Sequence, residues 1–146
     1  MHLVLSAQAV AVVRLPAGAP VPKWAAGSPL VSVTYTAQET SIVCPTSCLP
    51  DALPGPVEGP LVAAHVDGKL AFSQVGVLVS LLRPLADAGI PVLTVSTFDT
   101  DWVLVGSNRA AAAASVWRQA GFDVTEETRA EEPPAEEDTP NLEAQP

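Results

Sequence analysis

An internal repeat of an apolar hairpin pattern constrains the fold more than any other feature of this sequence. When the chain is shifted by 62 positions, the stretch AGSPLVSVTYTAQETSIVCP (26–45) lies over AGIPVLTVSTFDTDWVLVGS (88–107) without a gap. Ala, Gly, Pro and Val residues recur at matching positions, and most other pairs agree in size and polarity. In this alignment Glu39 lies over Asp101, so each copy has a carboxylate where its second strand begins. The repeat predicts a chain built from two related halves.

The second half predicts the order strand, helix, strand, strand, helix, strand. An apolar face at i, i+1, i+4, i+5 and i+8 indicates a helix that begins at Gly76 or Val77, contains Pro84 and ends at Gly89. We expect Ser107 or Asn108 to cap the second helix, which ends near Ala120. The expected strands are Leu61–Val66, Pro91–Val95, Trp102–Val105 and Phe122–Thr125. This order is typical of a ferredoxin-like split βαβ unit.

The first half is abbreviated. Proline-rich Pro16–Pro22 leaves room for barely a turn of helix at Lys23–Ala26, and the proline-rich stretch 44–60 reads as a connector. The expected strands are Leu3–Leu5, Ala9–Leu15, Leu30–Thr36 and Thr40–Cys44. We therefore expect an α+β protein with halves at 1–56 and 57–128, whose antiparallel sheets pack side by side.

Charge limits the choice of partner. The formal net charge is −9, which argues against nucleic acid or an anionic membrane as a partner. Residues 129–146 are acidic and proline-rich with few apolar side chains, so we expect them to be disordered. No apolar run reaches the roughly 18 residues that span a bilayer. The N-terminal stretch lacks the basic region of a signal peptide, so a cytoplasmic protein is expected.

The cysteines and histidines do not form a metal-binding pattern. Cys44 and Cys48 are spaced C-x-x-x-C, and the two histidines, His2 and His65, are far from them in sequence. Zinc needs four ligands of this kind, and a cytoplasmic disulfide is disfavoured. We expect no metal and no cofactor. The sequence also contains no nucleotide-binding glycine pattern and no nucleophile–histidine motif.

Six short motifs carry a resemblance to a known family. They are AVVRLP (11–16), PxW (22–24), ETSIVCP (39–45), GVL (76–78), PLAxAGI (84–90) and STFxTDWVLV (96–105). Together they cover most of residues 8–106, and in them the chain resembles the ACT-domain proteins. The similarity is greatest to small bacterial two-repeat ACT proteins and to the ACT repeats of cytosolic arginine sensors. The resemblance implies ferredoxin-like βαββαβ units that bind a free amino acid at the seam between sheets, without catalysis.

An amino acid needs N–H donors for its carboxylate and a carboxylate for its ammonium group. The loop that enters the first helix of the second half can supply the donors, because a helix N-terminus attracts anions. Asp101 can receive the ammonium group, with Thr97 and Phe98 beside it, and Ser41–Val43 are expected to form the opposite wall. The resemblance itself implies Ser41, Ile42, Gly76, Thr97, Phe98 and Asp101. The full expected set is Ser41, Ile42, Val43, Ser73, Gln74, Val75, Gly76, Val77, Thr97, Phe98 and Asp101.

Each of these residues also has a plainer interpretation. Asp101 can cap its own turn, Asp99 can be a solvated turn residue, and Glu39 can be a surface charge. Gly76 can serve helix entry alone. The leading hypothesis is an amino-acid-binding regulatory or sensor module. The alternative is a structural or interaction module that has no ligand and acts through dimerisation, with a homodimer or a regulatory protein as partner. Catalysis is the weakest of the three, because no nucleophile or histidine motif accompanies Asp99 and Asp101.

Overall fold

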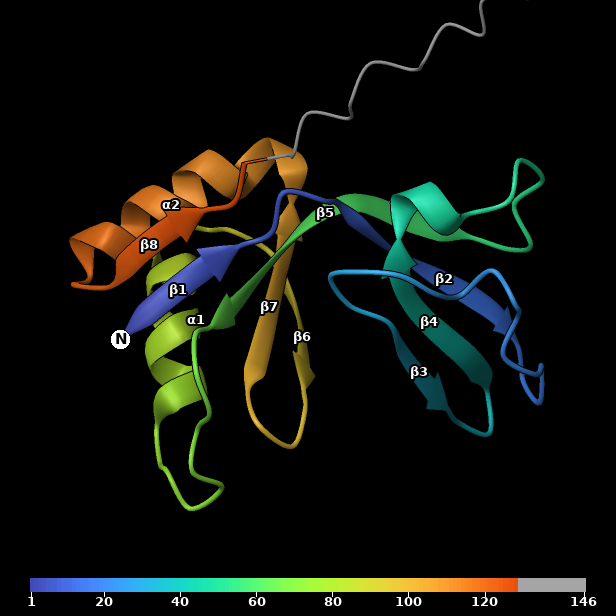
Figure 1. Cartoon of the computed structure of the whole chain (residues 1–146), viewed down its shortest axis with the longest axis horizontal. Helices are drawn as coiled ribbons and strands as arrows, with labels where there is room; N and C mark the ends of the chain where they lie inside the picture. The colour runs from blue at the N-terminus through green and yellow to red at the C-terminus, as the bar shows by residue number, and fades with distance from the viewer. Residues whose placement is uncertain (129–146) are drawn as a thin grey trace, which may run out of the picture.

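The computed structural model describes residues 1–128, and the predicted disordered tail 129–146 lies outside the described residues. Within these residues eight strands join in one sheet, and two helices belong to the second half of the chain (Figure 1). The strands are β1 (His2–Leu5), β2 (Val10–Pro16), β3 (Ser32–Tyr35), β4 (Glu39–Pro45), β5 (Val57–Val66), β6 (Val92–Ser96), β7 (Asp101–Gly106) and β8 (Asp123–Glu126). The helices are α1 (Val77–Asp87) and α2 (Ala110–Gln119), with short 3-10 turns η1 (Thr46–Cys48) and η2 (Ser107–Arg109). The predicted α+β class is confirmed.

The long strand β5 connects the two halves. Its first residues pair with β2, and its last residues pair with β1 along the same edge, while β7 pairs along the other edge. In Figure 1 β5 passes from the three strands β2, β4 and β3 on one side to the helix-bearing part on the other. The predicted connector 44–60 is therefore too long, because its last residues, from Val57, already form part of this strand.

The second half has the expected βαββαβ order along the chain. In the sheet, β1 from the start of the chain lies between its first and last strands. β1 lies between β5 and β8, antiparallel to the first and parallel to the second. We expected Leu3–Leu5 in the first half, but the strand completes the sheet of the second. The reason is packing, because Leu3 and Leu5 point into the core under the helices and are at most 3% exposed.

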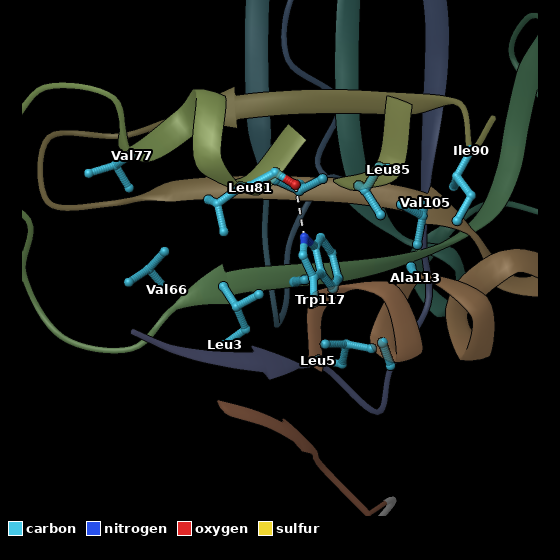
Figure 2. Packing of buried hydrophobic residues seen from close by; sticks show 13 residues of the cluster. Leu3, Leu5, Val66, Val77, Leu81, Leu85, Ile90, Val105, Ala113 and Trp117 are labelled. Atoms are coloured by element: carbon cyan, nitrogen blue, oxygen red, sulfur yellow. Dashed lines mark hydrogen bonds between the residues drawn. The ribbon is translucent and has the colours of Figure 1, made fainter. Parts of the chain in front are cut away.

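Both helices cover one face of the part of the sheet that belongs to the second half. Trp117 of α2 is fully buried, and its Nε1 donates a hydrogen bond to the carbonyl oxygen of Leu81 in α1 at 2.8 Å (Figure 2). Around it pack Leu85, Val105 and Ala113. Burying the indole while its N–H is satisfied avoids the cost of an unpaired polar group. The small Ala113 and Ala114 let α2 approach the sheet closely.

The ends of the helices only partly match expectation. Gly89 follows α1 with φ 68°, as predicted for a residue that ends a helix, and Pro84 lies inside α1. The predicted cap of α2 is wrong: Arg109 is the N-cap residue, and no side chain makes a capping hydrogen bond. Ser107 and Asn108 instead lie in η2, which precedes the helix.

The first half contains no α-helix within the described residues. Around Lys23–Ala26, where we expected barely a turn of helix, Ala25 N donates to Pro22 O at 3.1 Å in an isolated turn. The core of this half consists of Val13, Leu15, Ile42 and Cys44, covered by loop residues that include Trp24. A third cluster joins the halves: Val10, Leu30 and Val43 pack against Ala63 and Leu104.

The two hairpins repeat, but not at the offset that the sequence suggested. Thr36 N donates to Glu39 O at 2.9 Å, and Thr97 N donates to Thr100 O at 2.8 Å, so the turns coincide at an offset of 61. Asp101 therefore corresponds to buried Thr40, and the alignment of Glu39 with Asp101 is wrong. Shifting one strand by a single residue turns every side chain to its other face. The offset of 61 places buried residues of β4 over all three buried residues of β7, whereas the offset of 62 does not. At the offset of 61 Val43 corresponds to Leu104, and both lie in the cluster between the halves.

Candidate functional site

A small hollow lies where the β6–β7 turn meets the loop before α1. We call it the turn hollow; its volume is about 220 Å³. It is lined by Leu70, Ala71, Phe72, Gln74, Val77, Ser96, Thr97, Phe98, Asp99, Thr100 and Asp101. Five of the sequence-predicted residues, Gln74, Val77, Thr97, Phe98 and Asp101, come together here.

Hydrogen bonds hold the turn in place. Thr97 Oγ1 donates to Thr100 O at 3.1 Å, and Thr100 Oγ1 donates to Val66 O at 3.1 Å. Leu70 N donates to Asp99 O at 2.7 Å, which ties the loop before α1 to the turn. The turn is therefore held by its own threonine side chains and by contacts with β5 and with the loop before α1, which are distant in sequence.

Asp101 lies directly after this turn and lines the hollow. It is half-buried at the first position of β7, and Ser96 Oγ donates to its Oδ1 at 2.7 Å. Ser96 and Asp101 are the last cross-strand pair of the hairpin, so their side chains lie on the same face. Asp99 is exposed at the tip of the turn. The hydrogen bond from Ser96 thus fixes the carboxylate of Asp101, which lines the hollow.

The start of α1 forms the other side of the hollow. Gly76 is the N-cap residue with φ 81°, and no side chain makes a capping hydrogen bond to the first turn. The first backbone N–H groups of a helix have no acceptor within the helix, and they carry a partial positive charge. Ser73, Val75 and Gly76 belong to this loop but do not line the hollow, and Val75 is 93% exposed.

The other predicted wall lies elsewhere. Ser41, Ile42 and Val43 are on β4, paired with β2 and β3, and they do not line the turn hollow. Ile42 is fully buried in the core of the first half, and Val43 packs against the second half. The loop around Leu70–Gln74 takes the place we expected for them, because the bond from Leu70 N to Asp99 O draws that loop over the turn.

Sequence reasoning missed several residues of the hollow. Phe72 was not predicted; like the predicted Phe98 it flanks the hollow, and the two side chains are 91% and 86% exposed. Ser96 could have been found, since hairpin alternation places it opposite Asp101. Leu70 and Ala71 could not, because no local pattern indicates which loop reaches the turn.

Glu39 and His65 lie outside the turn hollow, and each contacts a neighbouring side chain. Glu39 forms an ion pair with Arg14, with 3.6 Å between Oε2 and Nε, which matches its interpretation as a surface charge. His65 stacks on Trp102 with ring centroids 4.4 Å apart. Burial lowers the pKa of His65, whereas Glu127 and Asp67 act in the opposite direction. Its Nδ1 is buried and has no hydrogen-bond partner among the described residues.

Cys44 and Cys48 lie together at the end of β4. Both are free thiols; Cys44 is buried, and Cys48 Sγ donates to Pro45 O at 3.0 Å. Burial, together with the neighbouring Cys48, raises the pKa of Cys44 to about 12. Among residues 1–128, no group of three or more His, Cys, Asp or Glu side chains could hold a metal ion. In the same part of the chain, no helix is both long and apolar enough to cross a bilayer.

Comparison with known proteins places the chain in a family. A family model described as ACT domain matches residues 60–118, and a second model, of an N-terminal domain, matches residues 8–52. The chain belongs to the ACT-domain proteins. It is 33% identical to protein Atu0741 from Agobacterium tumefaciens over 88% of this chain and 94% of that one, with a TM-score of 0.80.

More distant solved structures share the fold alone. The regulatory subunit of aspartate kinase from Thermus flavus is 12% identical, with a TM-score of 0.56 over 82% of this chain and 97% of that one. A Vibrio cholerae protein of unknown function, described as a possible transport protein, is 13% identical over 82% of this chain and 88% of that one, with a TM-score of 0.66. No curated protein matched the chain.

Proposed function

We propose that this chain is a regulatory module that binds a free amino acid in the turn hollow. The observation that carries the proposal is the position of Asp101 next to a cavity whose other side is the uncapped start of α1. The resemblance of the fold to a regulatory subunit of aspartate kinase supports a regulatory, non-catalytic role. The halves comprise residues 1–56 and 57–128, except that β1 pairs with strands of the second half.

The hollow offers a binding group for each charge of an amino acid. Asp101 receives the ammonium group through its free lone pairs, while Ser96 keeps the carboxylate in one orientation. The carboxylate of the ligand binds the N–H groups at the start of α1, near Val77. Thr97 and Phe98 bound the space above the turn, and Gln74 supplies an amide for a polar side chain. The volume of about 220 Å³ favours a small ligand.

A thermal-shift screen of the full chain against the twenty common amino acids tests this function. A ligand that binds only the folded chain raises the melting temperature in proportion to the logarithm of its concentration. We expect one or a few small polar amino acids to do so. If none changes the melting temperature at millimolar concentration, the amino-acid function is rejected.

One observation favours a second candidate, an interaction module that acts through dimerisation. Within the described part of the chain β6 pairs only with β7; its five residues carry no charge and no proline, and Val92 and Leu93 are 39% and 40% exposed. Proteins usually protect edge strands with charge, proline or a bulge. If β6 pairs with a second copy, Thr94→Pro lowers the molecular mass measured by light scattering from dimer to monomer. A wild-type monomer at micromolar concentration excludes this candidate.

A further inference from the structure

A second and larger cavity lies at the seam between the halves. We call it the seam groove; its volume is about 550 Å³. It is lined by Val12 from the first half and by Glu58, Leu61, Pro91, Val92, Leu93, Leu104, Gly106, Asn108 and Arg109. The turn hollow is at the opposite end of the β6–β7 hairpin, so the two cavities share no residue.

The walls of the seam groove are apolar. Leu93 pairs with Leu104 across β6 and β7, so both side chains point to the same face, which is the face away from the helices. Leu104 is buried beneath the groove, while Leu93 is 40% exposed. Val12 and Leu61 pack against the same cluster. The volume is within the range of small-molecule sites and accommodates a branched or aromatic body.

Arg109 is the cationic residue of the groove lining. Arg109 is half-buried, and within residues 1–128 its guanidinium forms no ion pair and no side-chain hydrogen bond. A partly desolvated guanidinium binds carboxylates strongly because its N–H groups match the two oxygens. Asn108, the preceding residue in the chain, also lines the groove.

Glu58, the other charged residue of the lining, disfavours a second carboxylate on the ligand. Glu58 lines the groove and is exposed, so a second anionic group on the ligand would meet a like charge. An ammonium group would instead find a partner there. The turn hollow has the opposite character, because its lining includes Asp99 and Asp101 and no cationic residue.

We propose that the seam groove is a separate binding site for a small apolar monocarboxylate. The carboxylate binds Arg109 and Asn108, and the apolar body lies on Leu61, Leu93 and Leu104. Because both halves line the groove, occupancy would stabilise their packing at the seam.

Calorimetry of the full chain with 4-methylpentanoate tests this site. We expect binding, and we expect the uncharged 4-methylpentanamide to bind about ten- to a hundredfold more weakly, since one charge-assisted contact is lost. Arg109→Gln should weaken 4-methylpentanoate binding by a similar factor. Arg83→Gln, which removes an exposed arginine outside the groove, is the matched control and should leave the affinity unchanged.

Two further experiments control for effects on folding and distinguish two kinds of carboxylate ligand. Leu93→Trp fills the groove from its exposed side and should abolish binding while the melting temperature stays near that of the wild type. If leucine binds more tightly than 4-methyl-2-oxopentanoate, and if Glu58→Gln removes this difference in affinity, the natural ligand is the amino acid. The reverse preference would identify the oxo acid.

Three results would overturn the proposal. The first is equal affinity for the acid and the amide, and the second is unchanged affinity in Arg109→Gln. The third is binding only after deletion of residues 129–146, which would assign the groove to the chain's own acidic segment. The test is independent of the turn hollow, because 4-methylpentanoate has no ammonium group for Asp101 to receive.

Discussion

The two halves of this chain share a hairpin but differ in what covers it. In the second half, the core under α1 and α2 has thirteen buried residues, Trp117 among them, whereas the separate core of the first half has four buried residues under loops. The hairpin turns are closely similar, since a threonine closes each with the same hydrogen bonds. The repeated strand pairing therefore does not require the helices to be repeated.

The difference indicates how the halves divide their roles. Helices bring an uncapped N-terminus to the turn of the second half, and this creates the turn hollow. The corresponding turn of the first half has buried Thr40, whose Oγ1 donates to Ala19 O at 3.2 Å, where the second half has Asp101. The first half thus serves as a wall of the seam, and the second half carries the candidate site for an amino acid.

Replacing a tryptophan in each half should distinguish the two cores most clearly. Trp117→Ala should lower the free energy of unfolding by about 3–5 kcal/mol, because the change leaves a large cavity. Trp24 is only half-buried under loops, so Trp24→Ala should cost less than half of that. Urea denaturation of both variants measures the difference. Equal losses would show that the first half depends on its core as much as the second.

The glycine that ends α1 should have a smaller effect. Gly89 has φ 68°, a conformation that costs other residues roughly 1–2 kcal/mol and β-branched residues more. Gly89→Val should therefore lower the free energy of unfolding by more than about 1 kcal/mol. Nothing lies within 4 Å of an added Cβ, so the effect is one of backbone strain. An unchanged urea midpoint would mean that α1 does not need to end at this residue.

The buried thiol of the first half should produce the smallest effect. In the unfolded chain Cys44 loses its proton from about pH 9.0, but in the folded chain its pKa is about 12. Between these values the unfolded state binds fewer protons, so the free energy of unfolding falls as the pH rises. From pH 9 to pH 10 we expect a loss of about 1 kcal/mol or less that is absent in Cys44→Ala. Identical pH dependence in both proteins would show that loops do not bury this thiol effectively.

Much of the fold could be predicted from local patterns. The apolar periodicity of α1, its end at Gly89 and the β6–β7 hairpin follow from residues that are neighbours in sequence. β1 could not be assigned correctly, because its alternation shows that Leu3 and Leu5 are buried but not which sheet buries them. The offset between the hairpins was missed by one position, since alignment of similar apolar residues does not register hydrogen bonding.

The candidate site, like the fold, could be predicted only where its residues are neighbours in sequence. Asp101, Thr97 and Phe98 belong to one hairpin turn, and Gln74 and Val77 belong to one helix entry, so local sequence grouped them. Their approach to each other depends on long-range contacts such as Leu70 N to Asp99 O. The placement of Ser41–Val43 depended on how the halves pack, which no local signal determines.

The central claim is that Asp101 binds the ammonium group of an amino acid in the turn hollow. Calorimetry with the amino acid found by the thermal screen should show that Asp101→Asn weakens binding about ten- to a hundredfold, because a partly desolvated charge-assisted hydrogen bond is lost. Asp99→Asn is the matched control and should have little effect, since Asp99 is exposed and its charge is screened. Equal losses in the two variants, or no loss in Asp101→Asn, would contradict the claim.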